Sequence, residues 1–155
     1  LAAKKATIIK SGNMSMGINI LQQVINKAAS LFDETFEIEV LETHHKHKID
    51  APSGTALMLG QSIASGKKKK LDQIKIVSKT GSRKKTQNGK ITFNSFRKGN
   101  VVGDHKAIFS SKDEVIELSH EALDRGIFAT GAIQAVKWGI NKKAGLYSMI
   151  DVLEK

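Results

Sequence analysis

The chain has 155 residues, of which 40% are hydrophobic, and it carries a net charge of +10 and no cysteine. This length is sufficient for one buried core. The absence of cysteine excludes a disulfide scaffold and is compatible with a reducing compartment. No apolar run reaches the length of a membrane span, so we expect no membrane partner.

The expected secondary structure follows from hydrophobic periodicity, which separates amphipathic helices from alternating strands. In chain order, we predict a short strand at residues 6–9, a helix at 16–32, a strand at 36–42, a helix at 54–65, strands at 73–78, 90–97, 101–109 and 114–120, and a helix at 124–141. The succession predicts an α+β fold, with a mixed sheet of about four to five strands and helices packed on one face. Phe93, Phe96 and Phe109 lie among these strands, so we expect apolar surface on the other face that a partner would cover.

The positive charge is concentrated at residues 67–70 and 83–85. Because phosphate contacts come mainly from Lys and Arg, a basic nucleic-acid or anion-binding module is an alternative function. Both runs lie in stretches with Gly, Ser or Asn that are typical of loops, and aromatic residues make up only 5% of the chain. We therefore interpret the runs as solvated loops that steer an acidic substrate, and we expect no nucleic-acid partner.

Residues 44–48 place three histidines and two lysines just ahead of a predicted helix start. Histidine titrates near neutral pH, so one of these imidazoles can pass protons. Lys48 can pair with an anion or donate a proton. A solvated loop is the alternative interpretation. A zinc site is disfavoured, because cysteine is absent and the histidine spacing is unlike that of metal ligands, so we expect no metal.

The helix that follows this run predicts an anion site. Either Asp50 or Ser53 can cap it, and Pro52 fixes the entry of the chain. Backbone N–H groups near Gly54 and Thr55 then lack intrahelical partners, which favours a carboxylate or phosphate at this position.

The run His-His-Lys-His-Lys-Ile-Asp-Ala-Pro-Ser-Gly-Thr-Ala at residues 44–56 resembles the signature of the dihydrodipicolinate reductase family of lysine biosynthesis. Residues 11–17, 97–105, 125–132 and 145–153 resemble further segments of that family, in the same order. The resemblance extends over essentially the whole chain.

The resemblance implies an oxidoreductase of lysine and diaminopimelate biosynthesis, which reduces 4-hydroxy-tetrahydrodipicolinate to tetrahydrodipicolinate with NADPH or NADH. It implies a dicarboxylate substrate, a homotetramer and a cytoplasmic location. It also implies a role for each matched residue: His44 as proton donor and acceptor, Lys48 as proton donor, His45, Gly54 and Thr55 as substrate-binding residues, and Ser11, Gly12, Asn13 and Met14 at the nicotinamide end of the cofactor.

The glycine-rich loop with which this family grips the dinucleotide has no counterpart in the chain. We therefore interpret residues 1–15 as a remnant of a truncated Rossmann-like domain, ending in its last strand. Residues 16–125 would form the substrate-binding and oligomerisation domain, and residues 126–155 a helix and tail that return toward the cofactor domain. We expect this fragment to be inactive alone. A purely structural oligomerisation domain is a third interpretation, which the intact signature disfavours.

Overall fold

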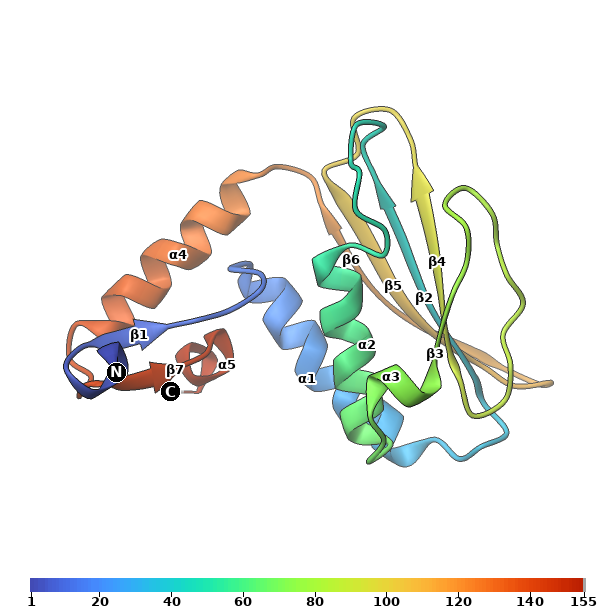
Figure 1. Ribbon diagram of the computed structural model, residues 1–155, viewed down its shortest axis with the longest axis horizontal. Coiled ribbons are helices and arrows are strands. Elements are labelled where there is room, and N and C mark those ends of the chain that lie inside the picture. The colour runs from blue at the N-terminus through green and yellow to red at the C-terminus, as the bar shows by residue number, and fades with distance from the viewer. Residues whose placement is uncertain (155) are drawn as a thin grey trace. The chain divides into compact units, whose positions relative to one another are not determined.

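The computed structural model describes residues 1–154 (Figure 1). The chain divides into two compact units, one formed by residues 1–20 with the C-terminal residues from 124 onward, the other by residues 21–123. The boundary falls within helix α1 (Met16–Leu31), so this helix contributes to both units. Among the residues described, no helix has the length and apolar character needed to cross a membrane.

The larger unit is built on a five-stranded mixed sheet with the order β3-β4-β2-β5-β6. Its strands are β2 (Glu37–His44), β3 (Lys75–Val77), β4 (Ile91–Arg97), β5 (Gly103–Ser110) and β6 (Val115–Ala122). Strands β3, β4 and β2 run parallel, whereas β5 and β6 continue the sheet in antiparallel pairing. The predicted α+β class and the mixed sheet are confirmed.

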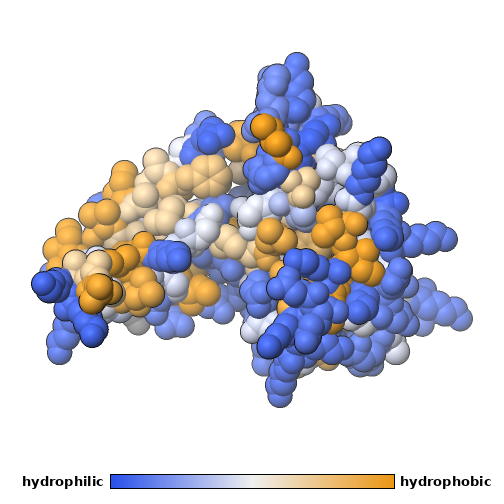
Figure 2. All heavy atoms as spheres, viewed as in Figure 1, coloured by the Kyte–Doolittle hydropathy of each residue, from blue (hydrophilic) through white to orange (hydrophobic). Residues whose placement is uncertain are grey.

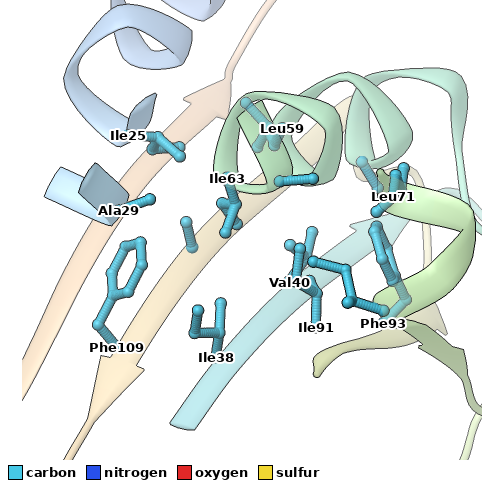
Figure 3. Packing of buried hydrophobic residues seen from close by; sticks show 14 residues of the cluster. Ile25, Ala29, Ile38, Val40, Leu59, Ile63, Leu71, Ile91, Phe93 and Phe109 are labelled. Atoms are coloured by element: carbon cyan, nitrogen blue, oxygen red, sulfur yellow. The ribbon is translucent and has the colours of Figure 1, made fainter. Parts of the chain in front are cut away.

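The core lies between this sheet and the helices on one of its faces (Figure 3). Successive strand residues point to opposite faces, so Ile38 and Val40 of β2 face inward together. Helix α2 (Gly54–Gly66) packs closely, because a Cβ at Gly60 would come within 2.2 Å of the Phe93 ring. Burying each large apolar side chain contributes about 1.5–3 kcal/mol, which makes this cluster the main source of stability of the unit.

The opposite face of the sheet carries both apolar and charged groups. Phe93 and Phe109 are buried in the helix-covered core, whereas Phe96 is half-buried, and Ile108 and Val115 line a hollow together with Glu39. Glu39 lies on the other face, where the segment between β3 and β4 crosses it and Arg83 binds its carboxylate through two hydrogen bonds of 3.0 and 2.6 Å. The alternation of β2 explains the difference, since its acidic residues at 37 and 39 are out of phase with the core.

Several predicted boundaries were wrong. The strand expected at 73–78 begins instead as a helical turn, α3 (Leu71–Ile74), whose two end residues are buried three positions apart, and only Lys75–Val77 is extended. Strand β2 continues to His44, beyond the expected residue 42, and thereby carries the signature into the sheet. Strand β5 starts at Gly103, where 101 was expected, and the last long helix is the shorter α4 (Gly126–Gly139).

The smaller unit contains the predicted first strand and three short elements that the sequence did not predict, namely a second strand, a short helix and a 3-10 turn. Strand β1 (Thr7–Ile9) pairs in parallel with β7 (Gly145–Tyr147), and the chain then enters α5 (Met149–Leu153). Ser148 and Asp151 form a reciprocal capping box at the start of α5. A 3-10 turn, η1 (Ala2–Lys4), precedes β1. Together with α4, these elements form one unit that combines residues from both ends of the chain.

The surface of the smaller unit is markedly apolar along α4 (Figure 2). Ile133, Val136 and Ile140 lie on one stripe of this helix and are 55%, 64% and 73% exposed. A cavity of about 400 Å³ between β1 and α4 is lined by residues that include Ile9, Met14 and Val136.

Replacing Gly131 by alanine is expected to destabilise the smaller unit by about 1–2 kcal/mol, as overpacking outweighs the gain in helix propensity. The new Cβ would lie 1.8 Å from the carbonyl oxygen of Met14. A backbone atom cannot relax away from such a contact as easily as the end of a flexible side chain can. Fluorescence of Trp138 during urea unfolding measures the change. Gly139→Ala is the matched control on the same helix, because its Cβ would meet side chains and no backbone atom, Cδ1 of Ile9 at 3.3 Å and Cγ2 of Thr7 at 3.6 Å. Equal stability of the two variants would contradict the prediction.

Candidate functional site

The site is organised around Glu42, whose side chain is 1% exposed at the C-terminal end of β2. Its register places it in phase with the buried Val40, so the carboxylate enters the helix-covered side of the sheet. Arg97 Nη1 lies 3.1 Å from each carboxylate oxygen, the backbone N–H of Ser53 donates at 3.3 Å, and the Nδ1 atom of His44 contacts the second oxygen. Burial acts to raise the pKa of Glu42, but the hydrogen bond with His44 and the positive charge of Arg97 hold it below its usual value.

His44 is positioned by its contact with Glu42 and by two neighbours on the adjacent strand β5. The imidazole is 7% exposed, and its ring lies 4.8 Å from that of His105 in an edge-to-face arrangement. A Cβ at Gly103 would approach the Nε2 atom of His44 to 3.2 Å, so a side chain at position 103 would press on that atom. Nδ1 of His44 is therefore anchored by Glu42, and Nε2 lies beside the glycine.

Arg97 connects the sheet to the loop that follows His44. Its Nε atom donates to the carbonyl of Lys48 at 3.2 Å, and Nη2 donates to the carbonyl of Asp50 at 2.6 Å. The same guanidinium holds Glu42, so a single side chain fixes both the strand end and the loop. Neither Glu42 nor Arg97 was among the site residues expected from the sequence.

The loop carries the other predicted residues. The ammonium of Lys48 forms an ion pair of 2.7 Å with Asp50, and the Lys48 side chain is 22% exposed. The amide of Lys48 donates to the carbonyl of His45, which makes a tight turn. His45 is half-buried, whereas His47 is exposed, and their rings lie 6.5 Å apart.

Ser53 caps helix α2, which resolves the choice between Asp50 and Ser53. Its hydroxyl oxygen accepts from the amide of Ala56 at 3.1 Å. Gly54 is exposed, and nothing lies within 4 Å of the position that a Cβ would take, so a ligand can approach the backbone there. The helix start thus has the features of an anion site that the sequence predicted at Gly54 and Thr55.

His105 is a buried neighbour whose role the sequence left open. Burial lowers its pKa from 6.5 to about 3, and repulsion from His44 acts in the same direction. Its Nε2 atom lies 3.2 Å from the hydroxyl of Ser53, which can donate to it because the same oxygen accepts from Ala56. In the described part of the chain, Nδ1 of His105 has no hydrogen-bond partner. The histidine is therefore neutral and joins the helix cap to His44.

Glu42, His44 and His105 each offer one atom of a kind that binds metals, and these atoms lie within 4.8 Å of one another. The guanidinium of Arg97 beside both oxygens of Glu42 disfavours a cation here, because it would be repelled. These three side chains are therefore better suited to a network of internal hydrogen bonds than to a metal centre.

The residues predicted at the nicotinamide lie in the smaller unit, on the loop from β1 into α1. Ser11 donates to the carbonyl of Asn13 at 2.8 Å, and the side chain of Asn13 accepts from the amide of Ser15 at 2.8 Å. These bonds shape the loop and leave Gly12 exposed without a side chain.

Comparison with known proteins identifies relatives over almost the entire chain. The family model described as "Dihydrodipicolinate reductase, C-terminus" matches residues 17–153. The 4-hydroxy-tetrahydrodipicolinate reductase of Brucella abortus (strain 2308) is 50% identical over 153 residues, which cover 98% of this chain and 57% of the relative. The 4-hydroxy-tetrahydrodipicolinate reductase 1 of Mesorhizobium japonicum is 51% identical, with 98% and 56% covered. The chain thus spans little more than half the length of these relatives.

A solved structure supports the fold. The chain is similar to a dipicolinate-bound dihydrodipicolinate reductase from Paenisporosarcina sp. TG-14, with a TM-score of 0.68 and 22% identity, over 94% of this chain and 53% of the other. At that identity the likeness concerns the fold alone. Together with the family match over residues 17–153, it leads to one conclusion: the chain belongs to the family of dihydrodipicolinate reductase C-terminal regions.

Proposed function

We propose that the full-length protein is a 4-hydroxy-tetrahydrodipicolinate reductase, and that residues 16–125 bind its substrate and complete the proton transfer. The observation that carries this proposal is the convergence of His44, the Lys48 loop and the open start of α2 through the shared partners Glu42, Arg97 and Ser53. Identity of about half to named reductases supports the same reaction.

The chemistry of the reaction fits these groups. A reduced nicotinamide supplies hydride to the unsaturated ring, a proton is taken up, and the hydroxyl group leaves as water. In our proposal the free Nε2 atom of His44 exchanges the proton, and Lys48 donates one or holds a carboxylate. His45 and the amides of Gly54 and Thr55 bind carboxylate oxygens, with about 1.5–3 kcal/mol for each charge-assisted hydrogen bond.

The cofactor is NADPH or NADH, and residues 11–14 contact its nicotinamide end. We propose that residues 1–15 and 126–155 belong with the cofactor domain, and residues 16–125 with the substrate-binding and oligomerisation domain. The exposed apolar stripe of α4 at Ile133, Val136 and Ile140 supports this, since such a surface is typical of one that packs against further protein. We further propose a homotetramer that acts in the cytoplasm, where reduced nicotinamides are supplied.

Titration of the isolated chain with dipicolinate is expected to shift the NMR signals of His44, His45, Gly54 and Thr55, because a planar dicarboxylate would bind the cationic groups and the helix start there. Picolinate, which lacks one carboxylate, should bind at least about tenfold more weakly, the loss of one charge-assisted bond. The isolated chain should nevertheless not reduce substrate with NADPH or NADH. Shifts centred on residues 67–70 and 83–85, equal for both ligands, would favour the alternative of a basic anion-binding or nucleic-acid-binding module.

A further inference from the structure

The carboxylate of Glu42 accepts hydrogen bonds from Arg97, the Ser53 backbone and His44, and the Ser95 hydroxyl lies close enough to lower its pKa. Arg97 donates from Nη1, Ser53 donates from its backbone N–H, and both groups can act in no other way. An ionised carboxylate accepts but does not donate, so the third neighbour, His44, must present a protonated Nδ1. In a neutral imidazole the other nitrogen then carries the lone pair.

We propose that Glu42 and Arg97 are a buried positioning pair: Glu42 fixes the tautomer of His44 so that Nε2 exchanges the proton, and Arg97 holds the Lys48 loop against the same carboxylate. The role in proton transfer rests on the proposed function. The tautomer and the anchoring of the loop do not, because they follow from the contacts alone.

The shape of arginine matters for the second part of this role. Nε and Nη2 donate to the carbonyls of Lys48 and Asp50 while Nη1 remains on Glu42. A planar fork can reach all three acceptors at once, whereas the single ammonium of lysine cannot. A lysine at position 97 would therefore keep the charge and release the loop.

The chain contains a matched control pair, whose carboxylate comes from the same strand β2 and whose guanidinium comes from the segment between β3 and β4. Glu39 accepts two hydrogen bonds from Arg83 and one of 2.8 Å from Asn94, and its side chain is 7% exposed. It faces away from His44, on the other side of the sheet. Glu39→Gln and Arg83→Lys thus repeat the same chemical changes without touching the site.

The first experiment measures the tautomer of His44 by long-range ¹H–¹⁵N NMR of the chain, at a pH where the ring is neutral. In Glu42→Gln, combined with Ser95→Ala to remove the neighbouring hydroxyl, the new amide group must face Arg97, the Ser53 backbone or His44, and of these only His44 can respond, by accepting at Nδ1. We expect the protonated nitrogen of His44 to switch from Nδ1 in the unchanged chain to predominantly Nε2 in this variant. Glu39→Gln should keep the Nδ1 form. An unchanged tautomer in Glu42→Gln, or an equal switch in Glu39→Gln, would overturn the proposal.

The second experiment does not depend on Glu42→Gln folding. In Arg97→Lys, hydrogen exchange at the amides of Lys46 and Lys48 is expected to accelerate at least tenfold, while Arg83→Lys leaves it unchanged. Equal exchange in both variants would refute the anchoring role.

Dipicolinate separates failure of this inference from failure of the proposed function. If the ligand binds the unchanged chain but the tautomer of Glu42→Gln stays as before, the positioning role fails and the function stands. If the tautomer switches but dipicolinate does not bind near His44, the contacts are right and the function fails. In the full-length reductase, Glu42→Gln should lower kcat at least 100-fold, and Glu39→Gln less than threefold.

Discussion

Replacement of His44 by glutamine in the full-length reductase is expected to lower kcat by about 10²–10⁴-fold, the usual contribution of a positioned proton-transfer group. Glutamine can still form a hydrogen bond with Glu42, but its amide cannot exchange a proton as Nε2 of His44 does in our proposal. KM should change little, because the amides of Gly54 and Thr55 still bind the carboxylates. Steady-state rates in both variant and unchanged enzyme measure the effect.

The matched control is His47→Gln, which removes an exposed imidazole from the same loop. Its kcat should remain within about twofold of the unchanged enzyme, since surface groups outside the site contribute little to the barrier. Lys48→Ala is expected to lower kcat as well, and Lys46→Ala, at an exposed position, serves as its control. Near-normal turnover in both His44→Gln and Lys48→Ala would refute the assigned roles.

The sequence predicted the long elements well because their periodicity is repeated over several turns or pleats. Helix α1 begins at the expected residue 16, and β2 shows the alternation that placed Ile38 and Val40 inside. Strand β7 has only three residues and is defined by its pairing with β1, far away in the chain. No local pattern identifies such an element. The helical turn α3 was mistaken for a strand because four residues hold too little periodicity to separate the two.

The same distinction applies to the site. The signature run predicted a loop and helix start with convergent cations, and these residues share partners in the structure. Arg97 reaches the site from β4 and His105 from β5. Arg97 is 55 residues away in sequence from its partner Glu42, and His105 is 52 residues away from its partner Ser53, so only the pairing of the strands brings them together. A signal for Glu42 was nevertheless present: it is an acidic residue in phase with the buried Ile38 and Val40. A charge on the core face of a strand indicates a paired, functional group.

The second large effect concerns pH. His105 is 4% exposed and has a pKa of about 3 in the folded chain, against 6.5 as the ordinary value. Between pH 6.5 and pH 3, His105 is protonated in the unfolded chain but not in the folded chain. The free energy of unfolding must therefore fall as the pH decreases from 6.5 toward 3. Below about 3 both states bind the proton and the loss is complete. The groups that act on His105 are His44, His120 and Lys48, which oppose its charge, and Glu42, which favours it.

We therefore expect the chain to be about 2.5 kcal/mol less stable at pH 4.5 than at pH 7 through this residue alone, at 1.36 kcal/mol for each pH unit. Urea unfolding followed by circular dichroism at the two pH values measures the total change. His105→Gln keeps a neutral group that can bond Ser53 but cannot be protonated, so its pH dependence should be smaller by that amount. Carboxylates titrate equally in both proteins and cancel in the comparison. An identical loss of stability in the variant would show that His105 accepts its proton within the fold, which burial against His44 and the helix cap should forbid.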